Sequence, residues 1–378
     1  MILSKAINFA ENLRYFRTKC KLTQKQLGNL IGYTEKSISQ WEQGNALPTM
    51  DTFLKLIDIF HITLDELMFE KNSCYYFLGI DGGGTKTAFK LIDENGTVVN
   101  QVYKGSSNPN DIGLENTFQV LNDGIKEVCY TIPYSQISMF AGISGGGLTS
   151  DNSQKLHSFF NNFGFYTFDN GSDIENLVAL SEFDKSVLVI MGTGFVVYAL
   201  DKETKKRISG WGQLFDEGGS GYTLGRDAIT AILCDLDKSG KATALTSLFE
   251  QKIGETAQNH LASLYQGGKR YISEFANLVF IAAQSGDKVA NEILEKNMRF
   301  VAEKINCAIN QIKTKSDEQN IPVLFSGGIC EKHETLFPLI KKHITANNYE
   351  LKVVEEEQVD GALKRARELF EVKNKKGA

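Results

Sequence analysis

The feature that most constrains the fold is a strand–glycine turn–strand pattern that occurs twice. Residues 75–92 consist of an apolar run, the glycine-rich segment DGGGTKT and a second apolar run. The same order returns at residues 186–201, where Gly192-Thr193-Gly194 is the turn. Short apolar runs bounded by glycine turns are typical of buried strands. The repetition therefore predicts an α/β body with two related halves.

Glycine turns at the ends of strands suit a phosphate ligand. The backbone can approach a phosphate group closely there and offer N–H donors to it. A third turn, Ser326-Gly327-Gly328, follows the apolar run 322–325 and precedes an expected helix, which makes it a natural shelf for adenosine. The nucleotide motifs GxxxxGK[ST] and GxGxxG are both absent from the sequence. The pattern indicates a nucleotide bound between the two halves by glycine turns that differ from these two motifs.

The N-terminal segment differs from the rest in charge and in periodicity. Residues 1–50 carry seven basic and three acidic side chains, although the whole chain has a formal net charge of −5. Thr23 and Thr34 are expected N-caps, and two capped helices joined by a glycine turn form the helix-turn-helix pattern. Leu27 and Leu30 should point inward. The five expected helices span residues 9–19, 24–31, 35–43, 50–60 and 64–69.

The run LTQKQLGNLIGYTEKSISQWEQGNALPTMDTFLKLIDIFHITLDELM closely resembles the lambda-repressor-like (Xre-type) DNA-binding domains. The resemblance implies a double-stranded DNA operator as partner, with residues 35–43 as the recognition helix in the major groove. It also implies a homodimer, because such heads usually bind paired half-sites. A five-helix protein-interaction module is the alternative. The implied DNA-binding residues are Glu35, Lys36 and Gln40 at bases, Gln24 and Ser37 at phosphates, and Arg14, Arg17 and Lys25 as electrostatic support.

The remainder of the chain carries the segments IDGGGTKT, AGISG, the segment around Asp173, MGTG, GWG…DEGGSGY, FSGGI and VDGA in order. Together they resemble the BadF/BadG/BcrA/BcrD ATPase family of the actin-like kinase superfamily, which includes N-acetylglucosamine kinases. The resemblance implies two ribonuclease-H-like (actin-like ATPase) domains that close over ATP and an amino-sugar substrate. The expected domains are an all-α helix-turn-helix domain at 1–72 and two α/β domains at 75–185 and 186–378.

The resemblance also implies roles for individual residues. Asp173 matches the catalytic base, which takes the proton of a sugar hydroxyl as the γ-phosphoryl group arrives. Its place at a helix start fits a simple N-cap as well. Asp81 matches the carboxylate that holds Mg²⁺, usually through water. The implied nucleotide-binding residues are Asp81, Gly82, Gly83, Gly84, Thr85, Lys86, Gly192, Thr193, Gly194, Gly327 and Gly328.

The sugar side departs from the family pattern at two places. Phe195 and Val196 follow the GTG turn, where the kinases usually have a small polar residue and then often Asn. The usual GDEGS stretch reads FDEGGS, which leaves open whether Asp216 or Glu217 reaches the sugar. The implied substrate-binding residues are Asn108, Ser144, Gly210, Asp216 and Glu217, with Trp211 beside the pocket.

Three functions are compatible with these motifs. The first is a DNA-binding N-acetylhexosamine kinase, which would link amino-sugar phosphorylation or sensing to transcription. The second is a sugar-responsive regulator with a catalytically silent body; Asp81 and Asp173 favour catalysis, whereas Phe195 argues against it. The third is an ATPase activator with a shared iron–sulfur cluster, which the sequence context of Cys129 and Cys330 disfavours. With no signal-peptide run and no membrane-length apolar stretch, a cytoplasmic protein with no membrane partner is expected.

Overall fold

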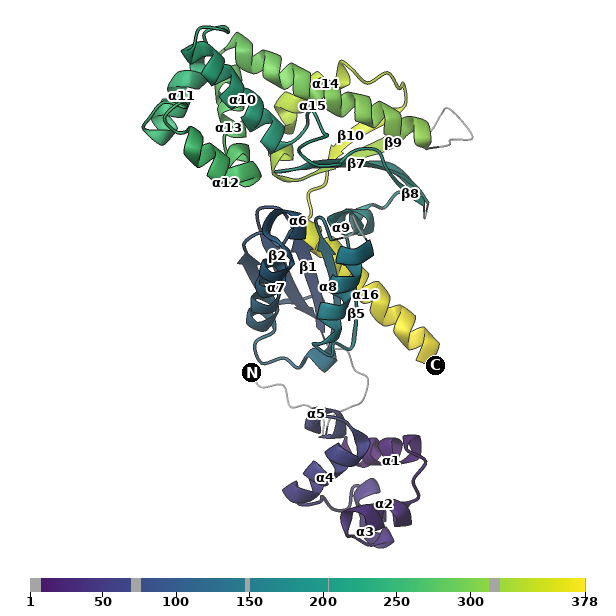
Figure 1. The fold of residues 1–378 in the computed structure, drawn as a ribbon. Helices are drawn as coiled ribbons and strands as arrows, with labels where there is room; N and C mark the ends of the chain where they lie inside the picture. The colour runs from purple at the N-terminus through teal and green to yellow at the C-terminus, as the bar shows by residue number, and fades with distance from the viewer. Residues whose placement is uncertain (1–7, 69–75, 147–149, 203, 313–319, 378) are drawn as a thin grey trace. The chain divides into compact units, whose positions relative to one another are not determined.

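The computed structural model describes residues 8–68, 76–146, 150–202, 204–312 and 320–377. The chain divides between residues 75 and 76 into two compact units, an all-α head and an α/β body (Figure 1). None of the helices in these ranges is both long enough and apolar enough to cross a membrane.

The head contains the five expected helices. Thr23 and Thr34 act as the predicted caps, since their hydroxyls accept hydrogen bonds from Gln26 N and Ser37 N. Gly32 ends the second helix at φ 82°, a left-handed conformation that suits glycine. The helices are α1 (Phe9–Lys19), α2 (Gln24–Ile31), α3 (Glu35–Glu42), α4 (Met50–Phe60) and α5 (Leu64–Met68). Residue 69, the expected end of the fifth helix, lies outside the described residues.

One packing expectation in the head was wrong. Leu27 is buried as expected, but Leu30 is 60% exposed. Helix α2 buries Leu27 and Ile31, which lie one turn apart on the same face, and Leu30 lies off that face. The core is completed by side chains such as Ile38 and Trp41 of α3.

The first sheet of the body has the strand order β3-β2-β1-β4-β5. Strand β2 is antiparallel to both of its neighbours, β1 and β3, whereas β4 is parallel to both of its neighbours, β1 and β5. On one face, Leu78 and Ile80 of β1 pack against α7 and α8. The elements are β1 (Tyr76–Gly82), β2 (Thr87–Asp93), β3 (Val98–Lys104), α6 (Pro109–Ile112), α7 (Leu114–Cys129), η1 (Tyr134–Gln136), β4 (Ile137–Ile143), α8 (Ser150–Asn161) and β5 (Thr167–Gly171).

The second sheet repeats the first strand by strand. Its order is β10-β9-β6-β7-β8, with the same pattern of antiparallel and parallel neighbours. Strand β6 occupies the position of β1, and β9 that of β4. The strands are β6 (Lys185–Met191), β7 (Phe195–Asp201), β8 (Thr204–Arg207), β9 (Ile321–Ser326) and β10 (Tyr349–Val353). The duplicated α/β body predicted from the glycine turns is confirmed.

Helices cover the outer face of the second sheet. They share with it the largest core of the chain, to which β6 contributes Val187, Val189 and Met191. These helices are α10 (Gly221–Leu236), α11 (Ala244–Ile253), α12 (Leu261–Ser273), α13 (Ala276–Gln284), α14 (Lys288–Gln311), η2 (Gly328–Lys332) and α15 (His333–Lys341). Each sheet with its helices is called a lobe below.

Two helices pack against each other and join the lobes. Helix α9 (Asp173–Leu180) follows the first sheet, yet its Ile174 and Leu177 share a core with Leu188 and Leu324 of the second. Helix α16 (Gln358–Gly377) follows the second sheet, yet it packs on β1 and β4 of the first (Figure 1, yellow). The C-terminal helix therefore lies with the first lobe, although the sequence boundaries grouped it with residues 186–378.

Candidate active site

The first glycine turn begins at the end of β1, where Asp81 is followed by Gly82. A Cβ atom on Gly82 would lie 2.3 Å from Ser107 Oγ, so glycine is needed for this close approach. The Ser144 N–H donates to Gly82 O at 2.7 Å, which ties the end of β4 to the same turn. Asp81, Ser144 and Asn108, the neighbour of Ser107, are therefore brought together.

Asn108 is buried, and its side chain is committed to the first lobe. Its Oδ1 accepts from Asn110 N at 3.0 Å, and its Nδ2 donates to Asp111 Oδ2 at 2.9 Å. A hydrogen-bonded side chain of this kind is held in one orientation before any ligand arrives.

The second and third glycine turns form one surface on the second lobe. The turn Gly192–Gly194 is held by the start of α10, where Gly221 N donates to Gly192 O at 2.8 Å. A Cβ atom on Gly327 would lie 2.5 Å from Met191 O, so the third turn lies against the end of β6. Gly328 then opens η2.

The turns of the two lobes meet. Thr85 Oγ1 of the first turn and Thr193 Oγ1 of the second share a hydrogen bond of 2.6 Å. The side chain of Lys86 extends towards β3, where its Nζ lies 5.2 Å from the ring centroid of Tyr103. The structure thus brings all three predicted glycine turns to one site, but directs the lysine of the first turn onto an exposed edge strand.

Asp173 lies at this site as the first residue of α9. The N-cap of that helix is Ser172, so Asp173 does not occupy the capping position. Burial raises the pKa of the Asp173 carboxyl, while a hydrogen bond from the Ser144 hydroxyl and the charge of Arg207 act in the opposite direction. The carboxylate is therefore held beside Ser144, one of the residues predicted to bind substrate.

Asp81 has a strongly perturbed carboxyl. Burial raises its pKa to about 7, the side-chain amide of Asn176 opposes this by donating to Oδ1 at 2.8 Å, and the negative charge of Asp173 raises it further. Asn176 is a residue that the sequence analysis missed. It lies three positions after Asp173 and so shares a face of α9 with it, a spacing that could have revealed it.

The surroundings of Asp81 fit the Mg²⁺ that the family resemblance implies. A carboxylate beside a phosphate-binding turn is the hard oxygen ligand that Mg²⁺ prefers. The buried Asn176 Oδ1 has no hydrogen-bond partner in the described structure, and the waters around a bound cation would supply one. Within the described ranges, no group of three or more His, Cys, Asp or Glu side chains could hold a metal.

Arg207 on β8 is a second residue that the sequence analysis missed. Its guanidinium lies 5.3 Å from the ring centroid of Tyr198 and 5.5 Å from that of Trp211, and its Nε donates to Tyr198 OH at 2.9 Å. Cation–π contacts of this kind hold the guanidinium in place. Because its charge lowers the pKa of Asp173, the second lobe favours the ionised form of a carboxyl in the first.

The two candidate sugar-binding carboxylates, Asp216 and Glu217, lie in different surroundings in the turn after β8. Asp216 is buried and accepts from Ser209 Oγ at 2.8 Å and from Gly212 N at 2.9 Å, with a longer contact to Gly210 N at 3.4 Å. Both of its oxygens therefore hold the turn that carries Gly210. Glu217 is exposed and remains available to a ligand.

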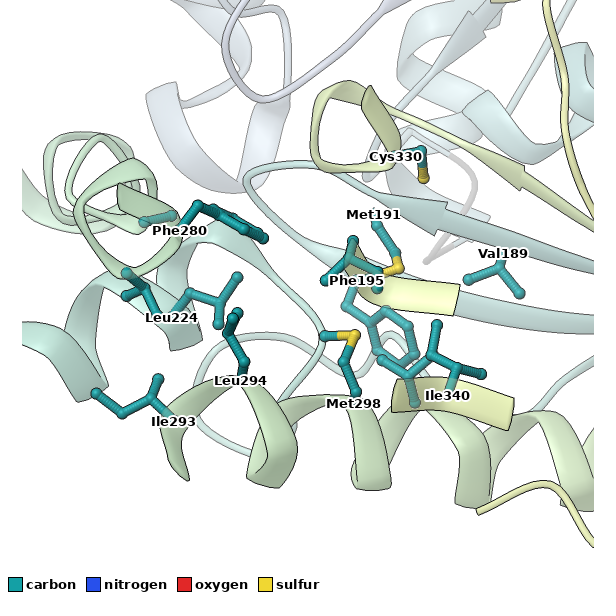
Figure 2. Packing of buried hydrophobic residues seen from close by; sticks show 14 of the residues in the cluster. Val189, Met191, Phe195, Leu224, Phe280, Ile293, Leu294, Met298, Cys330 and Ile340 are labelled. Atoms are coloured by element: carbon teal, nitrogen blue, oxygen red, sulfur yellow. The ribbon is translucent and has the colours of Figure 1, made fainter. Parts of the chain in front are cut away.

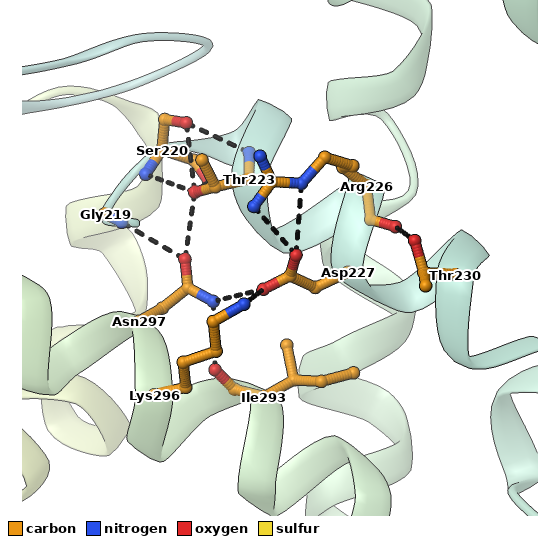
Figure 3. A network of polar contacts seen from close by, with 9 residues as sticks. All are labelled: Gly219, Ser220, Thr223, Arg226, Asp227, Thr230, Ile293, Lys296 and Asn297. Atoms are coloured by element: carbon orange, nitrogen blue, oxygen red, sulfur yellow. Dashed lines mark hydrogen bonds and ion pairs between the residues drawn. The ribbon is translucent and has the colours of Figure 1, made fainter. Parts of the chain in front are cut away.

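Asn297 of α14 anchors the residues that follow Glu217. Its buried Oδ1 accepts from Gly219 N at 3.1 Å and from Thr223 Oγ1 at 2.9 Å, and its Nδ2 donates to Asp227 (Figure 3). The network fixes the segment after Glu217 to the helices of the second lobe.

Phe195 points away from this site. Its side chain is buried in the core of the second lobe, 5.9 Å from Phe300 between ring centroids, among side chains such as Met191 and Met298 (Figure 2). Side chains alternate along a strand, so Val196 points to the opposite face. There its Cγ2 lies 2.5 Å from where a Cβ on Gly210 would be. Val196, and not Phe195, is therefore the departure that faces Gly210.

In the head, four predicted DNA-binding residues lie on the third helix. Of these, Glu35 and Lys36 are exposed, and Ser37 and Gln40 are half-buried. The Ser37 hydroxyl shares a hydrogen bond of 2.9 Å with the hydroxyl of its cap, Thr34.

Gln24 and Arg17 bind a carboxylate within the head. Gln24 Nε2 donates to Glu42 Oε2 at 2.8 Å, and Arg17 Nε pairs with Glu42 Oε1 at 2.6 Å. These bonds connect α1, α2 and α3 through a nearly buried carboxylate. They orient α3 relative to its neighbours, a function that the sequence pattern did not assign to Arg17.

Comparison with known proteins supports both units. The sequence model of the BadF/BadG/BcrA/BcrD ATPase family matches residues 78–363, and a helix-turn-helix model matches residues 13–67. The N-acetyl-D-glucosamine kinase of Dictyostelium discoideum is 28% identical over 297 residues, which cover 72% of this chain and 90% of that protein. The N-acetylmuramic acid/N-acetylglucosamine kinase of Clostridium acetobutylicum is 28% identical over 291 residues, which cover 74% and 93%.

A solved structure shares the fold of the body. It is a structural-genomics target from Chromobacterium violaceum, named as a candidate N-acetylglucosamine kinase, and it superposes with a TM-score of 0.63 at 23% identity. The superposition covers 77% of this chain and 99% of that one. With the family model spanning most of the sequence and its glycine turns meeting at one site, the chain belongs to the BadF/BadG/BcrA/BcrD ATPase family.

Proposed function

We propose that this chain is a DNA-binding protein whose body is an ATP-dependent N-acetylhexosamine kinase. The observation that carries the proposal is the setting of Asp173. It is half-buried, hydrogen-bonded by Ser144 and close enough to Asp81 for their charges to interact, beside turns from both lobes. The kinase names of the two relatives supply the substrate class.

In the proposed reaction, a sugar hydroxyl oxygen attacks the γ-phosphorus of ATP. The bond from that phosphorus to the bridging oxygen breaks, and ADP leaves. Asp173 accepts the hydroxyl proton as the new bond forms. The turns Gly82–Thr85 and Gly192–Gly194 bind the phosphates, and Gly327 and Gly328 support the adenosine. Mg²⁺ bound near Asp81 would neutralise phosphate charge.

The sugar would lie between the lobes, beside Asp173. Asn108 and Ser144 would contact it from the first lobe. Glu217 and the backbone of Gly210 would contact it from the second, with Asp216 holding their turn in shape. Phe195 does not argue against catalysis, because its ring lies in the core rather than at this site.

The proposal is tested by a substrate panel. Full-length protein with ATP and Mg²⁺ is incubated with N-acetylglucosamine, N-acetylmannosamine and N-acetylmuramic acid, and sugar phosphate is detected by mass spectrometry. We expect at least one sugar to be phosphorylated with stoichiometric release of ADP. If ATP and a sugar bind in thermal-shift measurements but no sugar is phosphorylated, the body is a sensor and not a kinase.

Arg207→Met should shift the pH dependence of the proposed reaction. The cation lowers the pKa of Asp173, so its removal raises that pKa and leaves less ionised base at a given acidic pH. We expect the acidic limb of the kcat–pH profile to move to higher pH, with the deficit shrinking as the pH rises. Lys206→Met, which removes an exposed neighbouring charge, is the control. A uniform loss of kcat at every pH would contradict this role.

For the head, we propose sequence-specific binding to duplex DNA through α3. Lys36→Ala and Gln40→Ala should each weaken binding to the cognate operator by about 1–3 kcal/mol and relax base preference. Arg14→Ala should weaken binding to all sequences alike and reduce its salt dependence. The measurement is a salt titration of binding to a selected operator and to a scrambled duplex. Failure of the wild-type protein to bind any duplex at low salt would overturn the proposal.

We also propose that the head acts as a homodimer on paired half-sites. Four apolar side chains of the head are largely exposed, which supports a contact with a second copy: Leu30, Leu47, Met50 and Leu54. Light scattering of the full chain, with and without operator DNA, should give a dimer mass. A monomer under both conditions would exclude this arrangement.

A further inference from the structure

Lys269 of α12 lies between the phosphate turns of the two lobes. Its Nζ is 3.6 Å from the position that a Cβ on Gly194 would occupy, and 3.9 Å from Asp111 Oδ1 of the first lobe. Asp111 Oδ2 lies in turn 3.2 Å from the Cβ position of Gly84. A lysine ammonium group is therefore placed beside both turns, 75 residues beyond the second turn in the sequence.

The local backbone explains why Lys269 is there. It follows Gly267-Gly268, and Gly268 has φ 59° and ψ −155°, which interrupts the helical conformation of α12. Only glycine adopts such a backbone conformation readily. The helix resumes after the break and ends at Ser273, whose Cβ lies 3.3 Å from the Cβ position of Gly221. Gly221 holds the second phosphate turn, so the position of Lys269 is tied to that turn.

The partner that Lys269 has in this structure is weakly bound. The 3.9 Å separation from Asp111 is too long for a hydrogen bond, and the two side chains are 22% and 27% exposed. Asp111 is already engaged, since it accepts from Asn108 Nδ2 at 2.9 Å. Exchanging this contact for a phosphate oxygen would cost little. It would add a charge-assisted hydrogen bond, which is stronger than a neutral one.

We propose that Lys269 is a nucleotide-binding residue that contacts the β- or γ-phosphate of a nucleoside di- or triphosphate. This rests on the ATP site of the proposed function, but not on the identity of the sugar. The ammonium of Lys86 lies over Tyr103, although its charge still acts on Asp81, so Lys269 would add a second positive side chain beside the phosphate turns. When Lys269 binds phosphate it leaves Asp111, which is also hydrogen-bonded to Asn108. Nucleotide binding would therefore be coupled through Asp111 to Asn108, a residue proposed to contact the sugar.

The test measures nucleotide binding to the full chain by isothermal titration calorimetry with Mg²⁺ and no sugar. Lys269→Met should weaken ATP and ADP binding by about 10- to 100-fold, the value of a lost hydrogen bond to a charged group. AMP affinity should stay within about twofold, since AMP lacks the β- and γ-phosphates. Lys304→Met is the matched control, because Lys304 lies on α14 over the ring of Phe300 and should leave all three affinities unchanged.

Asp111→Asn separates phosphate binding from a merely structural ion pair. If Lys269 binds phosphate, removal of the opposing negative charge should leave ATP affinity equal or higher. If the ion pair only joins the lobes, Asp111→Asn and Lys269→Met should weaken ATP binding alike, and that result would overturn the proposal. Unchanged ATP and ADP binding in Lys269→Met would overturn it as well. Since no sugar is present, failure to phosphorylate amino sugars would leave the outcome of this test intact.

Discussion

Asp173→Asn should lower kcat for sugar phosphorylation by about 100- to 10,000-fold, the usual contribution of a general base. The asparagine has nearly the same shape, so it can still accept the hydrogen bond from the Ser144 hydroxyl. It cannot accept a proton from the sugar. The base would be lost while the geometry of α9, whose N-cap position is Ser172 and not Asp173, is retained.

Binding measurements distinguish this role from damage to the fold. ATP affinity and the thermal midpoint of Asp173→Asn should stay close to those of the wild type, because the phosphate turns do not depend on this carboxylate. Glu182→Gln, which neutralises an exposed acid just after α9, should leave kcat unchanged. If Asp173→Asn keeps more than a tenth of wild-type kcat, Asp173 is not the base.

Gly361→Ala should destabilise the body by about 3 kcal/mol or more, at the upper end of the cost of overpacking. A Cβ on Gly361 would lie 1.9 Å from Asn176 O and 2.6 Å from Asn176 C, both of them backbone atoms that no side-chain rotation can move aside. Helices α9 and α16 cross at this contact. Relief requires the two helices to separate, although each is also packed against a sheet.

Thermal unfolding of the full chain provides the measurement. A loss of this size corresponds to a fall in the body's midpoint of roughly 6 °C or more. Gly105→Ala is the control, because Gly105 is exposed and nothing lies within 4 Å of its Cβ position. A midpoint for Gly361→Ala that matches the control would show that α9 and α16 do not cross as closely as described. Asn176 also donates a hydrogen bond to Asp81. If the variant folds with α9 displaced, it should therefore lose activity as well.

The glycine turns were predictable because their evidence is local. An apolar run that ends at Asp81 or at Met191 and then meets glycines signals a strand and a tight turn within a few residues. The observed strand β7 begins directly after the Gly192–Gly194 turn and ends at residue 201 as expected, and the repeated strand order confirms the duplication. The caps Thr23 and Thr34 belong to the same class, since each acts on a backbone N–H three residues away.

The residues that were missed or left open share a different property. Arg207 acts on Asp173 across the two lobes, and Lys269 reaches a turn from a helix that is remote in the sequence. From the sequence, Phe195 argues against catalysis because a residue after a phosphate turn can face the site, but its ring lies in the core. Side chains alternate along β7, and the face of the strand that includes Phe195 packs in the core with α14. Asp216 and Glu217 are adjacent in the sequence, and only the folded turn distinguishes them.

By itself, the sequence determined the elements of this protein: a helix-turn-helix head, two strand–turn–strand repeats, and three glycine turns suited to phosphate. Each depends on hydrogen bonds and steric limits within a few residues, which a linear pattern records. The tertiary structure alone decided which side chains meet those turns and that α16 packs on the first sheet. Such pairings depend on packing and charge between segments far apart in the chain, and no local pattern carries that information.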